Sequence, residues 1–148
     1  MIERNFLTPK EVACELVTVA ENKVNYSIVQ KIILGIIAGA YIAFAAVASN
    51  TAAFQLMNNP STLGISKLIS AFVFSGGLIL VVVCGSKLFT GNNLMLMGVY
   101  EKKISVKQLL LSWTIVYISN FVGSILIAFL VTKSGQLDFA GSMLGGST

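Results

Sequence analysis

Residues 84–95 read CGSKLFTGNNLM, and this polar stretch interrupts an otherwise apolar part of the chain. The 34 residues from 67 to 100 would form a helix about 50 Å long, whereas the hydrocarbon core of a bilayer is about 30 Å thick. A helix of that length must tilt steeply, protrude from the bilayer or break. We expect a break at mid-membrane in this apolar segment, 68–100. Five residues mark it: Lys87, Thr90, Gly91, Asn92 and Asn93.

The composition of the chain points to a lipid environment. Of its 148 residues, 55% are hydrophobic and 11% are charged, and the mean hydropathy is +0.84. A soluble domain carries about 25% charged residues. The chain has no histidine, and its two cysteines, Cys14 and Cys84, lie far apart, so the usual ligands of a metal or haem centre are lacking. We predict a bilayer-embedded protein that is not an enzyme, uses no cofactor or metal and binds no nucleic acid.

Two further segments are long enough to cross a bilayer. Residues 32–54 and 109–132 contain 23 and 24 residues without a charge, and about 20 residues suffice. Gly35 and Gly39 in the first segment are spaced so that another helix can approach closely. Trp113 and Tyr117 lie near the start of the other segment, where amphipathic rings favour the membrane interface, and Asn120 lies near its middle. Together with 68–100, these segments predict an all-α membrane protein with three transmembrane helices.

The two ends of the chain differ from these spans. Residues 8–22 are expected to form an amphipathic helix that starts with a capping box of Thr8 and Glu11, with Pro9 at the first helical position. Two placements of this helix are open: at the membrane surface or against neighbouring subunits, or solvated and packed on the rest of the protein. Residues 133–148 form a tail without a periodic pattern. We treat 1–148 as a single membrane domain.

Basic residues predict the orientation in the membrane. Seven lie in the N-terminal segment and in the loop before the third span, and two lie on the opposite side. The excess of lysine and arginine marks the cytoplasmic side. We therefore expect a multi-pass protein of the inner (plasma) membrane with a cytoplasmic N-terminus and an external C-terminus. The seven are Arg4, Lys10, Lys23, Lys31, Lys102, Lys103 and Lys107; the two are Lys67 and Lys133.

Irregular backbone inside a membrane is tolerated only where protein buries it or water reaches it, so the break is expected to line a pathway. The second half of the helix is expected to start near Asn93 or Leu94. Its N-terminus would carry about half a positive charge, which favours an anion. Thr90 offers a hydroxyl, Asn92 offers an amide, and Gly91 permits the turn. The alternative is a simple loop, with 94–100 lying at the interface.

Three stretches carry a resemblance to a known family. GSKLFTGN at 85–92 is similar to the signature G-[SA]-[ED]-L-F-T of the formate/nitrite transporter family. GIIAG at 35–39 with YI at 41–42 resembles the first-helix motif of that family, and YISNFVG at 117–123 resembles its third-helix pattern. The resemblance extends in order over residues 7–146, and the branch it resembles most is that of the hydrosulfide channels.

The resemblance implies an aquaporin-like fold of two inverted three-helix repeats, with the second and fifth helices broken, in a pentamer with one pore per subunit. It implies passage of small monovalent anions such as formate, nitrite or hydrosulfide. Phe74 and Leu78 would narrow the pore from the second helix and Leu88 from the loop. Thr90 would be the central polar contact, with Asn92 nearby.

The chain departs from this pattern in three ways. Lys87 stands where the family has an acid, the chain matches only the first repeat, and the pore histidine of the second repeat has no counterpart here. Lys87 would attract anions, hold them too tightly to pass, or reach towards water or carbonyl groups.

Three spans cannot enclose such a pore, so a second copy or a second half must complete it. An inverted pair of copies is one possibility, although the seven-to-two distribution of basic residues disfavours insertion in both orientations. A homo-oligomer, pentamer-like or built from inverted pairs, would follow. The alternative is a truncated, non-conducting fragment or a membrane scaffold or accessory subunit.

Overall fold

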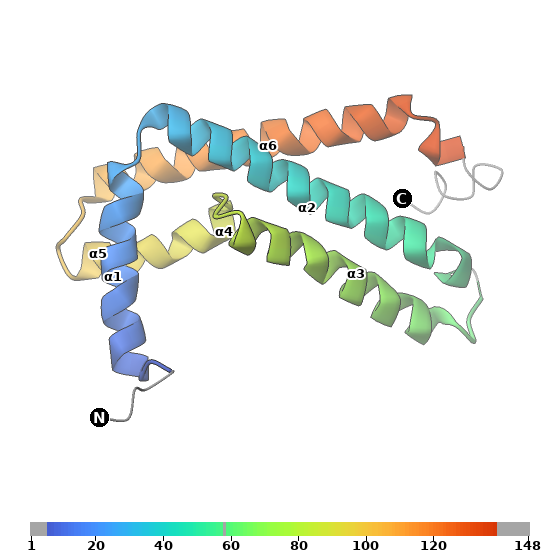
Figure 1. Ribbon diagram of the computed structural model, residues 1–148, viewed down its shortest axis with the longest axis horizontal. Helices are drawn as coiled ribbons and strands as arrows, with labels where there is room; N and C mark the ends of the chain where they lie inside the picture. Colours follow the sequence, from blue (N-terminus) through green and yellow to red (C-terminus); the bar gives the residue numbers. More distant parts are fainter. Residues whose placement is uncertain (1–5, 58, 139–148) are drawn as a thin grey trace.

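The computed structural model describes residues 6–57 and 59–138, and within these ranges it contains helices and no strand. Three helices, α2, α3 and α6, are long and apolar enough to cross a membrane. The prediction of an all-helical membrane protein with three spans is thereby confirmed. The elements in chain order are α1 (Pro9–Asn25), α2 (Ile28–Met57), α3 (Leu63–Val83), α4 (Phe89–Asn92), η1 (Asn93–Met95), α5 (Leu96–Tyr100), α6 (Val106–Lys133) and η2 (Gln136–Asp138) (Figure 1).

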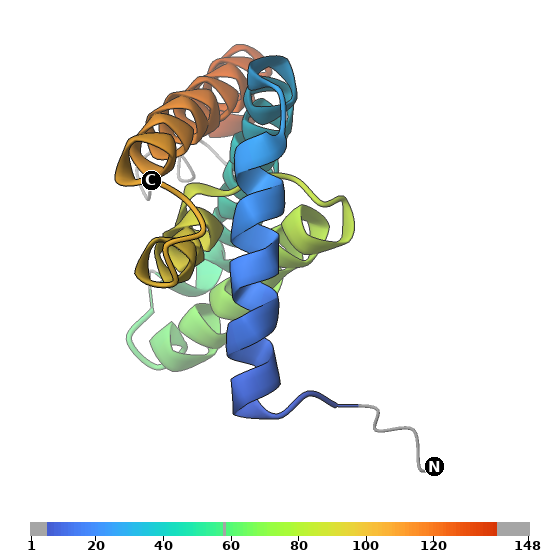
Figure 2. The same ribbon diagram turned by 90° about the vertical axis from the view of Figure 1, so that its left-hand side faces the viewer.

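Helix α2 packs along both α3 and α6 and forms the centre of the molecule. Helix α1 runs across the end at which α5 and the beginning of α6 lie (Figure 1, Figure 2). The second span is broken: α3 stops at Val83, and the chain then continues as the short helices α4, η1 and α5. This break lies about midway along the long axis of the molecule (Figure 1).

Glycine residues, which have no side chain, allow the backbones of α2 and α6 to contact each other directly. A Cβ atom on Gly39 would overlap the main-chain carbonyl of Asn120, and one on Gly123 would overlap that of Ile36. Gly35 is closed off in the same way by the Cβ atom of Ser119, 2.6 Å from where its own would stand. Glycine is required here because helix association in lipid depends on close packing rather than on the hydrophobic effect.

Helix α1 begins with the capping box that its sequence indicates. The Thr8 amide donates to the Glu11 carboxylate at 2.6 Å, and the Glu11 amide donates to the Thr8 hydroxyl at 3.4 Å. These hydrogen bonds hold the pKa of the Glu11 carboxyl below its usual value. The helix packs on the rest of the protein through Ala20, which is buried against Met95 and Leu109.

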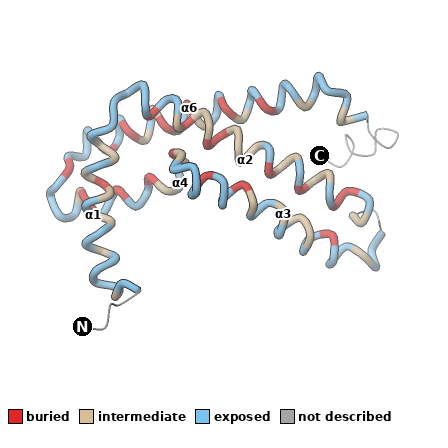
Figure 3. Tube along the Cα trace, viewed as in Figure 1, coloured by how far each residue is buried: buried red, intermediate tan, exposed pale blue. Residues whose placement is uncertain are grey.

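The distribution of polarity is that of a membrane protein. Large apolar side chains of the spans point outwards, and Phe72 and Val83 of α3 are 81% and 77% exposed. Helix α3 is exposed over much of its length (Figure 3). The buried polar and charged side chains, by contrast, lie between the helices: Lys31, Ser49, Ser66, Lys87, Asn92, Ser112 and Ser119. Of the expected tail, residues 139–148 lie outside the described residues.

Candidate functional site

The break in the second span consists of residues 84–88. Cys84 caps α3, Gly85 follows with φ of 61°, and Leu88 is extended before α4 begins at Phe89. A positive φ is readily adopted by glycine alone, so Gly85 allows the chain to leave α3 sharply. Gly91, expected to permit the turn, is instead helical.

The second half of the broken span therefore begins at Phe89 rather than near Asn93 or Leu94, and the expected start was wrong. Residues 90–93 are polar, and such polarity predicts an irregular backbone. Their backbone is nonetheless helical, and neighbouring helices bind the carboxamide oxygen and the main-chain carbonyl of Asn92, as described below.

Asn120 of α6 holds the break in place. Its Oδ1 accepts from the Phe89 amide at 2.9 Å, and its Nδ2 donates to the carbonyls of Gly35 at 2.8 Å and Lys87 at 2.9 Å. One side chain thus ties α6 to α2 and to both sides of the Leu88 linkage. Asn120 was not among the predicted site residues, although it is the one carboxamide in the uncharged segment 109–132.

Lys87 is buried in the break. Its amide donates to the Leu34 carbonyl at 3.1 Å, and the residue is 5% exposed. Its Nζ lies 3.5 Å from the centroid of the Tyr26 ring, within the range of a cation–π contact. Within the part of the chain that the structure describes, this Nζ has no hydrogen-bond acceptor.

Asn92 is the second buried polar residue of the site, 1% exposed. Its Oδ1 accepts from Lys23 Nζ at 3.1 Å, and its main-chain carbonyl accepts from Trp113 Nε1 at 2.9 Å. Lys23 Nζ also donates to the Gly91 carbonyl at 3.0 Å. Burial lowers the pKa of Lys23. Helix α1 thereby supplies a cation to the site, which no pattern in the sequence of this helix indicates.

A third lysine lies beside these two. Lys31, at the start of α2, is 6% exposed, and its Nζ donates to the Val24 carbonyl at 3.0 Å. Lys23 and Lys31 each act electrostatically on Lys87. No carboxylate of residues 6–57 and 59–138 forms an ion pair with any of them. We call these three residues the lysine cluster.

The remaining predicted residues lie on the surface or away from the cluster. Thr90 and Asn93 are exposed, and Leu88 is partly buried in the break. Phe74 and Leu78 of α3 are 42% and 52% exposed, and Phe74 lines a shallow hollow with Ser49 and other residues of α2 and α3, apart from the break. Pore constriction by Phe74, Leu78 and Leu88 stays a prediction.

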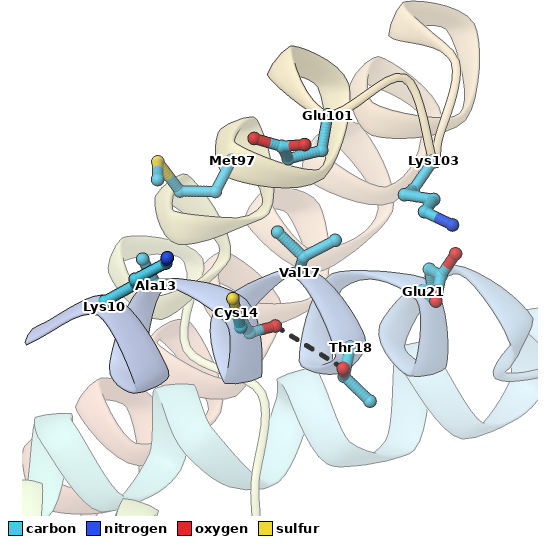
Figure 4. Close-up of a pocket in the computed structure, with 9 residues that line it drawn as sticks. All are labelled: Lys10, Ala13, Cys14, Val17, Thr18, Glu21, Met97, Glu101 and Lys103. Carbon is cyan, nitrogen blue, oxygen red and sulfur yellow. Dashed lines mark hydrogen bonds between the residues drawn. The ribbon is translucent and has the colours of Figure 1, made fainter. Parts of the chain in front are cut away.

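A separate groove of about 510 Å³ lies between α1 and α5 (Figure 4). Charges of both signs line it together with the Cys14 thiol. Its lining includes none of the residues of the break. Within the described residues, no cluster of metal-ligating side chains occurs there or elsewhere. Its lining residues are Lys10, Ala13, Cys14, Val17, Thr18, Glu21, Met97, Glu101 and Lys103.

An all-helical membrane protein whose second span is broken around buried polar groups has the architecture of a channel or secondary transporter. The sequence comparisons agree with this class. Residues 10–147 match the sequence profile described as formate/nitrite transporter, and the chain belongs to that family.

Curated relatives support the same assignment. A protein named formate channel FocA from Haemophilus influenzae is 37% identical over 139 residues, which are 94% of this chain and 48% of the relative. A probable formate transporter from Methanothermobacter thermautotrophicus is 34% identical over 135 residues, covering 90% of this chain and 49% of the relative. An uncharacterized transporter, YrhG, from Bacillus subtilis is 35% identical over 125 residues, 84% of this chain and 46% of the relative.

The chain spans about half the length of the curated relatives it matches. These relatives are named as channels and transporters, in agreement with the prediction that the chain is not an enzyme.

Proposed function

We propose that the chain forms one half of a membrane pathway for small monovalent anions, formate above all. The observation that carries this proposal is the break at residues 84–88, held open by Asn120 halfway along an apolar span. Unwound backbone inside a bilayer costs several kcal/mol for each unsatisfied group unless protein or water covers it. A water-accessible pathway beside the break satisfies that requirement.

The charge of the site supports an anion rather than a cation. Lys87 lies in the break, Lys23 contacts Gly91 and Asn92 just beyond it, and the lysine cluster has no acidic partner within the described residues. Thr90 is exposed next to these cations on the first turn of α4 and offers a hydroxyl to a passing solute. A hydroxyl binds a small anion weakly enough to release it, as conduction demands.

A second three-helix unit completes the pathway in this proposal. The outward face of α3, with Phe72, Leu78 and Val83 exposed, is not covered by any segment within residues 6–57 and 59–138. The half-length match to the relatives supports such a unit. It is a second copy of the chain in inverted orientation or a separate second half, within a homo-oligomer in the plasma membrane with the N-terminus in the cytoplasm.

Flux measurements on the purified protein in liposomes test this function. We expect formate to pass faster than nitrite, and hydrosulfide to pass if the chain belongs to the hydrosulfide branch. Thr90→Phe should reduce formate flux at least about tenfold, because a bulky apolar group costs on the order of 1.4 kcal/mol or more at a narrow polar point. Thr114→Phe is the matched control, since Thr114 is an exposed threonine on α6.

Equal flux in the two variants would contradict the assigned pore. No flux in the unmodified protein would favour the alternative, a non-conducting fragment, scaffold or accessory subunit. Assembly of both variants is checked by the mass of the detergent-solubilised complex, which also reports the copy number.

A further inference from the structure

The lysine cluster concentrates three positive charges around one small region of the fold. Lys23 comes from the last turns of α1, Lys31 from the first turn of α2, and Lys87 from the break. Tyr26, at the junction of α1 and α2, covers Lys87 with its ring. Lys23 and Lys31 thus lie near enough to Lys87 to act on its charge, where the N-terminal helix, the first span and the interrupted second span come together.

Their hydrogen-bonding capacity is largely unused. Each ammonium group carries three N–H donors. Lys23 Nζ donates to two acceptors and Lys31 Nζ to one, while Lys87 Nζ donates to none among the described residues. Asn92 Nδ2, on the same carboxamide that accepts from Lys23, is also buried and has no partner in the described part of the chain.

This arrangement is unfavourable as it stands. Burying an ammonium group without a counter-charge is strongly unfavourable, and repulsion from neighbouring lysines adds to that cost. The Tyr26 ring offsets only part of it, because a cation–π contact is weaker than the hydration that burial removes. The missing element is one negative charge with several acceptor positions.

We propose that a small oxyanion of carboxylate size resides in the lysine cluster as its counter-ion and stabilises the fold of the break. The site is enclosed rather than open, because Lys31 and Lys87 are only 6% and 5% exposed. Such a site accepts a free ion of a few atoms more readily than an acidic side chain of another polypeptide. This inference does not depend on the protein conducting anions.

The dependence of unfolding on the anion tests the proposal. The unfolding midpoint of the detergent-purified protein is measured in sodium formate and in sodium gluconate at constant ionic strength, since gluconate carries the same carboxylate on a bulky chain. Formate should raise the midpoint by about 5 °C for each tenfold increase in concentration above its dissociation constant. Gluconate should not.

Lys87→Glu provides the decisive variant. A carboxylate at this position supplies the missing charge within the chain, so the variant should reach the higher midpoint without formate and lose the dependence on formate. Lys67→Gln, at an exposed lysine of α3, is the control and should respond like the unmodified protein. If Lys87→Glu does not fold, Lys23→Gln replaces it and should weaken the formate response at least tenfold in concentration.

Identical midpoints in formate and gluconate overturn the proposal. So does a formate response that persists unchanged in Lys87→Glu, or in Lys23→Gln where that variant replaces it. A response to gluconate equal to that of formate shows a carboxylate site open enough for another chain, which also overturns the enclosed site. Liposome flux separates this inference from the proposed function. Stabilisation by formate without formate flux would contradict the proposed pathway but not the anion site. Flux without stabilisation would contradict the anion site but not the pathway.

Discussion

The contact between α2 and α6 and the break in the second span are built on opposite rules. Between α2 and α6, Gly39 and Gly123 bring two backbones together, and no room is left for even a methyl group. At the break and in α4 beside it, Lys87 Nζ and Asn92 Nδ2 are buried and have no hydrogen-bond partner among the described residues. Close packing therefore fixes the α2–α6 contact, whereas directional hydrogen bonds hold the break in the second span.

Asn120 belongs to both regions, and this explains how the α2–α6 contact positions the break. Its main-chain carbonyl forms part of the close contact with Gly39, and its side chain binds the Phe89 amide and the Lys87 carbonyl. The contact between α2 and α6 thus places the Asn120 carboxamide within hydrogen-bonding distance of the break. The difference between the regions leads us to expect large, global effects from changes in the first and smaller, local effects from changes in the second.

The largest effect is expected for Gly39→Ala. The added Cβ overlaps the Asn120 carbonyl, which is backbone and cannot turn aside, so we expect destabilisation of about 3 kcal/mol. Gly76→Ala in α3 is the matched control, because its Cβ would meet nothing within 4 Å. Alanine should stabilise the helix there by up to about 1 kcal/mol. Thermal unfolding in detergent measures both, and equal shifts in the two variants would show that the α2–α6 contact is not limiting.

Asn120→Leu should have an intermediate effect confined to the break. It removes three hydrogen bonds and takes their side-chain partner from the Phe89 amide and the Lys87 carbonyl, a loss of about 2 kcal/mol. Hydrogen exchange should accelerate at residues 85–92 while α2 and α6 stay protected. Asn22→Leu, at an exposed asparagine of α1, serves as the control. Uniform acceleration across all helices would instead mean that the break and the α2–α6 contact unfold as one unit.

The sequence predicts the helical fold and the existence of the break because both depend on local properties. Segment length, lack of charge and the excess length of 67–100 are sufficient for that conclusion, and the Thr8–Glu11 box is readable within four residues. The predicted start of the helix after the break was wrong because it depends on partners that are distant in the sequence. Lys23 is 69 positions from Asn92, and Asn120 is 85 positions from Gly35.

The lysine cluster shows the same limit. Lys23 and Lys31 were counted only as markers of orientation, and their sequence neighbours do not indicate a site. Lys23 reaches Gly91 and Asn92 because α1 packs against η1 and α5, which a periodic pattern in α1 cannot specify. Lys87 and Asn92 were predicted as site residues because they interrupt an apolar segment. The sequence therefore predicts the residues that the broken span contributes to the site, but not those that α1 and α2 contribute.

The smallest effect is expected for Trp113→Phe, which separates the polar from the aromatic contribution of α6 to the break. The ring of Trp113 lies edge-on to Phe89 with centroids 5.9 Å apart, and Nε1 donates to the Asn92 carbonyl. Phenylalanine retains a ring there but loses that donor, so we expect a loss of about 1 kcal/mol. Tyr117→Phe is the control, because Tyr117 makes the equivalent ring contact at 5.5 Å and its hydroxyl makes no hydrogen bond within the described residues. Equal midpoints in the two variants would assign the stabilisation to ring packing. A lower midpoint for Trp113→Phe alone would show that the hydrogen bond from Nε1 to the Asn92 carbonyl contributes directionally, as the contrast with the α2–α6 contact requires.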